Sequence, residues 1–114
     1  MGSFSKINEK VIGMVLVTRE IERQLEKHPL MSQADKGEDA KVIVKFFNPC
    51  GSGTWLITEA EKHGDDWLFF GYIHIHTWEW GYVTLSELKN ARLPFGLKIE
   101  RDLYAKGTVK ELKQ

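Results

Sequence analysis

The centre of the chain most constrains its fold, because strand-like segments follow one another there with only short turns between them. β-branched and aromatic residues are dense in this part of the sequence, and glycine, proline, asparagine or aspartate mark the turns. The predicted strands are residues 42–47, 54–60, 67–76 and, after a turn, the segment within 77–85. We therefore expect consecutive strands to form a mainly antiparallel sheet.

The third of these segments is long and carries large side chains on both faces. Because successive strand residues point to opposite faces, Trp67 and Phe69 share one face while Phe70 and Tyr72 share the other. This pattern is typical of a central strand that a helix covers on one side and that is partly covered on the other. Gly71 in its middle predicts a bulge or a close backbone approach.

A helix is predicted ahead of the sheet, over residues 19–28. Thr18 is a good N-cap, since its hydroxyl can accept a hydrogen bond from an otherwise unpaired backbone N–H. Ile21 and Leu25 lie four residues apart and so share one face of the helix. Pro29 ends the helix, because the residue before a proline disfavours the helical conformation.

Three further segments complete the predicted domain. Residues 86–91 indicate a short helix with Ser86 or Thr84 as its N-cap. Residues 97–104 alternate apolar and charged positions, and charges of this density suit a last strand at the edge of the sheet. Residues 32–41 are polar, contain a glycine and lack apolar periodicity, which predicts an exposed loop.

The fold class that follows is α+β: a mainly antiparallel sheet of four to five strands with one or two short helices packed on it. A chain of 114 residues suits a single domain. We place this α+β domain at residues 16–105, after an N-terminal extension over residues 1–15. Residues 106–114 are polar and are expected to form a flexible tail.

Charge and cysteine content restrict the class of protein. The 16 Lys and Arg residues balance the 16 Asp and Glu residues, which argues against a strongly basic nucleic-acid binder and against an acidic DNA mimic. Cys50 is the only cysteine, so no intramolecular disulfide can form. No apolar run is long enough to predict a transmembrane helix. We expect a cytoplasmic protein without a cofactor, as a monomer or a weak dimer.

His74 and His76 are the sharpest chemical signal in the sequence. Two residues apart on a predicted strand, their rings project from one face, as two ligands of a Zn²⁺ ion would, and His63, Glu79 or Cys50 could complete the set. The alternative is a pair of half-buried strand histidines. We favour that alternative, because the spacing fixes no third ligand. No metal site is therefore favoured, and no catalytic residue is assigned.

Aromatic residues are unusually frequent on the predicted sheet. Trp55 and Trp67 are interpreted as core residues, whereas Trp78 and Trp80 lie beside a predicted turn, where at least one indole is expected at the surface. Aromatic and arginine side chains dominate the binding energy of protein interfaces, and aromatic rings also stack on unpaired bases. The predicted partner-binding residues are Tyr72, Trp78, Glu79, Trp80, Tyr82, Arg92 and Arg101.

Three segments, taken in order, resemble a known family. They are residues 44–59 (VKFFNPCGSGTWLITE), 79–88 (EWGYVTLSEL) and 94–104 (PFGLKIERDLY). Together with the helix start after Leu16 and Val17, they resemble the DUF2958 family, a small domain of unknown function, over residues 16–105. The resemblance implies a protein carried by mobile genetic elements of bacteria or phages, and it implies no established activity or catalytic residue.

These observations lead to one leading hypothesis and two alternatives. The leading hypothesis is a non-enzymatic protein-binding module of a mobile genetic element, acting as an anti-defence inhibitor (anti-CRISPR or anti-restriction) of a host nuclease. The first alternative is an accessory single-stranded nucleic-acid-binding protein in conjugation or replication, although zero net charge permits only weak binding to phosphates. The second alternative is a small zinc-dependent hydrolase that uses His74 and His76.

Overall fold

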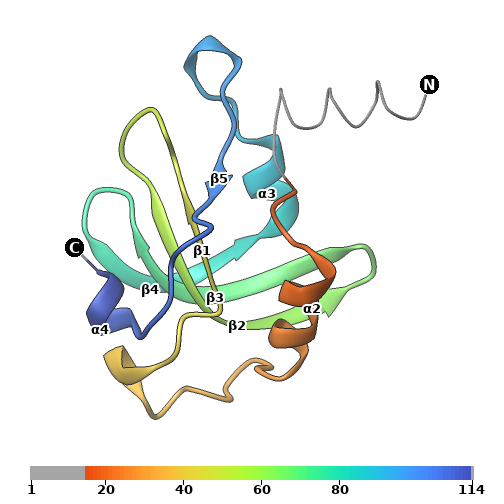
Figure 1. Cartoon of the computed structure of the whole chain (residues 1–114), viewed down its shortest axis with the longest axis vertical. Helices are drawn as coiled ribbons and strands as arrows, with labels where there is room; N and C mark the ends of the chain where they lie inside the picture. The colour runs from red at the N-terminus through yellow and green to blue at the C-terminus, as the bar shows by residue number, and fades with distance from the viewer. Residues whose placement is uncertain (1–14, 114) are drawn as a thin grey trace.

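A computed structural model describes residues 15–113, and within this range one sheet of five strands forms the centre of the molecule (Figure 1). The order of strands is β4-β3-β2-β1-β5, and every neighbouring pair is antiparallel. This arrangement confirms the predicted α+β class. Residues 1–14 of the expected N-terminal extension lie outside the described range. The elements are α2 (Arg19–Glu26), η1 (Gly37–Asp39), β1 (Val44–Phe47), β2 (Thr54–His63), β3 (Asp66–His74), β4 (Trp78–Thr84), α3 (Leu85–Asn90), η2 (Pro94–Gly96), β5 (Glu100–Arg101) and α4 (Val109–Leu112).

A bulge in β2 decides which of its side chains lie on which face of the sheet. The register between β2 and β3 shifts between Ile57, which is opposite Gly71, and Glu59, which is opposite Phe70. A Cβ atom on Gly71 would lie 2.0 Å from the carbonyl oxygen of Leu56, so only glycine allows the two strands to approach this closely. The predicted bulge or close approach at Gly71 is confirmed. As a consequence, Glu59 shares a face with Phe70.

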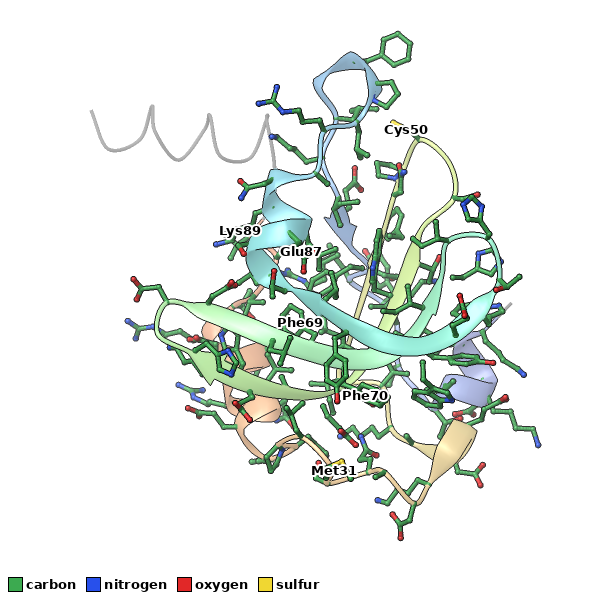
Figure 2. All side chains as sticks on the ribbon, turned by 180° about the vertical axis from the view of Figure 1, so that it is seen from behind. Met31, Cys50, Phe69, Phe70, Glu87 and Lys89 are labelled. Carbon is green, nitrogen blue, oxygen red and sulfur yellow. The ribbon has the colours of Figure 1, made fainter. Side chains whose placement is uncertain are left out.

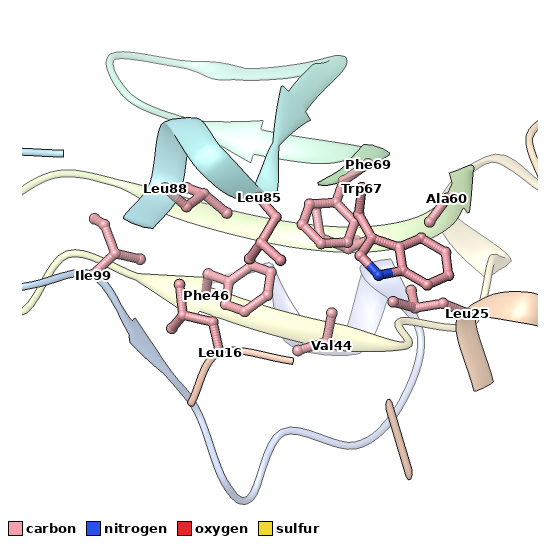
Figure 3. Packing of buried hydrophobic residues seen from close by; sticks show 11 residues of the cluster. Leu16, Leu25, Val44, Phe46, Ala60, Trp67, Phe69, Leu85, Leu88 and Ile99 are labelled. Carbon is pink, nitrogen blue, oxygen red and sulfur yellow. The ribbon is translucent and has the colours of Figure 1, made fainter. Parts of the chain in front are cut away.

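One face of the sheet packs against α2 and α3 and forms the main hydrophobic core (Figure 3). The threonine caps explain where both helices begin: Thr18 accepts a hydrogen bond from the backbone of Ile21, and Thr84 forms a capping box with Glu87. Of the two caps expected for the second helix, Thr84 is therefore the one used. Trp67 is buried in this core, as predicted. The buried members of the core are Leu16, Leu25, Val44, Phe46, Ile57, Ala60, Trp67, Phe69, Leu85, Leu88 and Ile99.

The other face of the sheet is covered in part by the C-terminal segment. Val109 of α4 is fully buried in a second, smaller cluster with Ala40, Val42 and Leu56. The Lys113 ammonium lies 2.7 Å from a carboxylate oxygen of Glu38, which adds a contact at the end of the segment. Within the described part of the expected tail, residues 106–113, the buried side chain of Val109 packs this polar sequence against the sheet.

Local boundaries also differ from those predicted. The first strand begins at Val44, the third ends at His74, and the strand expected over 97–104 is reduced to Glu100–Arg101 at the sheet edge. The loop over residues 32–41 is not fully exposed, because Gln33 is buried. Among the described residues, no helix has the length and apolar character needed to cross a membrane.

Candidate functional site

Aromatic side chains gather on the face of β3 and β4 that points away from the main core. The pairing of these strands places Phe70 opposite Tyr82, Tyr72 opposite Trp80, and His74 opposite Trp78. Residues that are directly opposite in a sheet lie on the same face. We call this surface the aromatic face, and its members are Phe70, Tyr72, His74, Trp78, Trp80 and Tyr82.

The rings of the aromatic face contact one another in an unbroken series. The centroid distances are 5.1 Å for Trp78 and Tyr72, 4.8 Å for Tyr72 and Trp80, 5.6 Å for Trp80 and Phe70, and 5.0 Å for Phe70 and Tyr82. These distances are within the range at which aromatic pairs stabilise each other. The face is therefore a laterally supported surface rather than a set of independent side chains.

One end of the aromatic face is covered and the other is open. Tyr72 and Trp78 are half-buried and pack against the cluster under α4, whereas Trp80 is 40% exposed and Tyr82 is 60% exposed. The prediction that at least one indole beside the β3–β4 turn is exposed is confirmed by Trp80. Any contact with a partner would consequently form at the end carrying Trp80 and Tyr82.

A groove with a volume of about 190 Å³ opens at this exposed end, between the aromatic face and the loop that follows α2. Figure 2 shows that Met31 of this loop lies on the same side of the sheet as Phe70, while the neighbouring Phe69 points toward α3. We call this hollow the aromatic groove; it is lined by Met31, Gln33, Ala34, Gly37, Thr58, Glu59, Phe70, Trp80 and Tyr82.

Met31 occupies the rim of the groove in an uncommon backbone conformation. Its φ is 78°, in the left-handed region that disfavours residues with a side chain, and its side chain is 73% exposed. Such a conformation persists only where the surroundings impose it. Here the backbone N–H of Met31 donates a hydrogen bond of 2.7 Å to Oε1 of Glu59.

Glu59 is the charged group of the groove. It is only 3% exposed, and its second oxygen, Oε2, accepts a hydrogen bond of 2.9 Å from the backbone N–H of Gln33. None of the ion pairs formed within residues 15–113 includes Glu59. Burying a carboxylate is costly unless hydrogen-bond donors compensate for the lost water. Among the described residues, the backbone N–H groups of Met31 and Gln33 are the donors that stabilise the buried Glu59 carboxylate.

Gln33 links the same loop to the sheet. Its side-chain amide donates to the carbonyl oxygens of Lys41 and Thr58 at 2.9 and 2.8 Å, and its Oε1 accepts from the N–H of Lys41 at 2.8 Å. Gln33 is 4% exposed, so the loop predicted to be exposed is pinned at this residue. The only sequence signal for this network is the polar pair Thr58 and Glu59 inside a predicted strand.

The predicted partner-binding residues do not all lie together. Tyr72, Trp78, Trp80 and Tyr82 share the aromatic face, but Glu79 pairs opposite Ile73 and so points to the other side of the sheet. Arg101 lies opposite the core residue Phe46 and donates a hydrogen bond to the carbonyl of Val15. Arg92 follows α3, which packs on that same core face. The two arginines are therefore remote from the aromatic face, contrary to the grouping expected.

His74 and His76 do not extend one strand face as predicted. The ring of His74 contacts that of Trp78 at a centroid distance of 5.1 Å, whereas β3 has already ended before His76, which is exposed in the following turn. Throughout the described part of the chain, no three His, Cys, Asp or Glu side chains are grouped as metal ligands would be. Cys50 is exposed in the β1–β2 turn, with its Sγ 3.9 Å from the Pro94 carbonyl oxygen.

Comparison with known proteins identifies a family for this chain. No curated protein and no solved structure matches it. The family model described as "Protein of unknown function (DUF2958)" matches residues 16–112, which includes the whole sheet, both walls of the aromatic groove and α4. The match extends beyond the predicted domain end at residue 105. The chain belongs to the DUF2958 family.

Proposed function

We propose that this protein is a non-enzymatic binding module that docks a partner protein at the aromatic groove. The observation that carries the proposal is the exposure of Trp80 and Tyr82 beside a groove of about 190 Å³. Small-molecule sites usually enclose roughly 300–1,000 Å³. A smaller groove between exposed aromatic side chains suits one side chain inserted by a partner, since aromatic residues around such pockets dominate interface energies.

Charge favours a protein partner over a nucleic acid. Phosphate binding needs cations beside the stacking rings, but Arg101 lies on the opposite side of the sheet, and Lys113, which interacts with Tyr72, is paired with Glu38. The groove itself contains the carboxylate of Glu59, which repels a phosphate. Zero net charge adds no long-range attraction for a polyanion.

The partner class that we propose is a host defence nuclease, inhibited by docking of this module in an anti-CRISPR or anti-restriction role. The support is the mobile-element setting that the family resemblance implies, together with the absence of an assigned catalytic group. The proposed partner class and the proposed docking site are separate proposals, because the same groove would also suit another protein of the host.

The experiment compares three forms of the protein in partner capture and in inhibition of candidate nucleases. Wild type is tested beside the double variant Trp80→Ala/Tyr82→Ala and beside Tyr104→Ala, a matched control that removes an aromatic ring exposed to 90% outside the groove. We expect wild type and the control to bind one partner equally, and the double variant to bind at least about 30-fold more weakly, as for an interface hot spot. A partner retained by the double variant would contradict the docking site, and failure to find any partner would contradict the binding function.

A further inference from the structure

We propose that the aromatic groove receives the guanidinium group of an arginine side chain on the partner protein. The inference rests on the proposed docking function and adds the chemical identity of the inserted side chain. Its basis is the combination, in one groove, of a buried carboxylate with exposed aromatic rings.

The carboxylate of Glu59 has acceptor capacity to spare. Each of its oxygens accepts one backbone N–H, from Met31 and from Gln33 respectively, whereas a carboxylate offers about four acceptor positions. One position on each oxygen therefore remains for an incoming donor. A guanidinium presents parallel N–H groups that match two carboxylate oxygens at once.

The rings of the groove supply the second half of the recognition. Trp80, Tyr82 and Phe70 line the groove together, and each can attract a cation that lies within about 6 Å of its centroid. A guanidinium is planar and weakly hydrated, so it stacks on such rings more readily than an ammonium does. The stem of an arginine would also pack against the exposed side chain of Met31.

Other occupants fit the groove less well. A purely apolar side chain would leave the spare acceptor positions of Glu59 without a donor and would supply no counter-charge, which is unfavourable. A carboxylate or phosphate would be repelled by the same group. A lysine would bring charge without the planar fork.

The test titrates the full-length, isotope-labelled protein with three blocked tripeptides, Gly-Arg-Gly, Gly-citrulline-Gly and Gly-Lys-Gly, and follows its NMR spectrum. Citrulline has the shape of arginine without its charge. We expect the arginine peptide to shift the backbone amides of Met31 and Gln33 and the indole of Trp80, with the citrulline peptide about tenfold weaker or more. The lysine peptide should bind more weakly than the arginine peptide.

Variants separate the two halves of the site. Trp80→Leu and Tyr82→Leu each remove a ring at an exposed position and should weaken the arginine peptide several-fold, whereas Tyr104→Leu should leave it unchanged. Glu59→Gln should reduce the preference for arginine over citrulline to the part that the rings provide, since cation–π attraction remains in this variant. If that variant does not fold, the comparison of arginine and citrulline on wild type still decides the role of charge.

Equal binding of the arginine and citrulline peptides, or no shift at Met31, Gln33 and Trp80, would overturn the inference. The same outcome would not remove the docking function, because a captured partner could still depend on Trp80 and Tyr82. Conversely, arginine-specific binding supports the inference even where no nuclease is inhibited.

Discussion

At the scale of single residues, two buried polar side chains build one wall of the groove. Glu59 binds the backbone of Met31 and Gln33, and the Gln33 side chain binds Lys41 and Thr58. The contacts between this loop and the strand residues Thr58 and Glu59 join residues 25 to 28 positions apart in the sequence. The contacts between Gln33 and Lys41 join residues 8 positions apart. Apolar side chains at these positions could not satisfy the same backbone groups, so the loop conformation depends on this pair.

We expect Gln33→Leu to destabilise the protein by about 2–4 kcal/mol, because it leaves the buried carbonyl of Thr58 and both backbone groups of Lys41 without their partner. The measurement is the free energy of unfolding from urea denaturation. Ser32→Ala is the matched control, since Ser32 is exposed in the same loop and should change stability by less than about 0.5 kcal/mol. Equal stability of Gln33→Leu and wild type would show that the loop does not depend on this side chain.

The contact between Asp66 of β3 and Ser86 of α3 provides a test of how the stability of the protein depends on pH. The pKa of Asp66 is lowered from its ordinary value of 3.8, mainly because the Ser86 hydroxyl donates a hydrogen bond of 2.7 Å to its carboxylate. Burial raises this pKa, and the backbone N–H groups of Trp67 and Ser86 lower it further. Because the folded-state pKa is depressed, the stabilisation is present above the unfolded-state pKa and is lost as pH falls through the folded-state value.

Ser86→Ala should therefore raise the pKa of Asp66 toward its ordinary value and reduce the loss of stability in acid. Carboxyl NMR titration measures the first effect, and urea denaturation between neutral pH and pH about 3 measures the second. Ser52→Ala, in the exposed β1–β2 turn, is the control and should leave the pKa of Asp66 unchanged. An unchanged Asp66 titration in Ser86→Ala would contradict the assigned cause.

At the scale of elements, the bulge in β2 determines the composition of the aromatic groove. Without the register shift between Ile57 and Glu59, strand alternation would place the carboxylate of Glu59 on the core face. Beside the bulge, Gly71 approaches the Leu56 carbonyl more closely than a residue with a Cβ atom could. The bulge in β2 therefore places the negatively charged carboxylate of Glu59 in the aromatic groove.

Gly71→Ala should consequently destabilise the protein by about 1–3 kcal/mol or more, since the new Cβ would meet backbone rather than a movable side chain. Thermal and urea unfolding measure the loss. Gly51→Ala is the matched control: it has no atom within 4 Å of the position of its Cβ and lies in an exposed turn. A Gly71→Ala protein as stable as Gly51→Ala would disprove the close approach.

Elements with strong local signals could be predicted from the sequence, and those defined by distant contacts could not. The caps at Thr18 and Thr84 and the hairpin before Thr54 follow from nearby residues. The helix at Val109 also begins at a local signal, the capping box of Thr108 and Glu111, but its packing depends on Leu56, which is far away in the sequence. The burial of Glu59 likewise depends on backbone groups 26 and 28 residues away.

At the scale of the whole molecule, the two faces of one sheet have different coverings. The face under α2 and α3 is closed by the main core, whereas α4 covers only the end of the aromatic face that carries Tyr72 and Trp78. The aromatic rings could be predicted from the sequence, but not the end of the face that stays open, because this depends on where α4 packs. The extent of α4 therefore sets the extent of the docking surface.

The last prediction tests whether α4 is part of the folded domain. Val109→Asp places a charge in a fully buried position and should destabilise the protein by about 3 kcal/mol or more, while Lys110→Asp introduces the same residue at the neighbouring exposed position and should cost far less. Urea denaturation measures both. In Val109→Asp, release of α4 should also uncover Tyr72 and Trp78, which increases quenching of tryptophan fluorescence by acrylamide. If the two variants are equally stable and equally quenched, α4 does not hold the covered end of the aromatic face. The open end would then owe its exposure to β3 and β4 alone, and the docking surface would extend along the entire face.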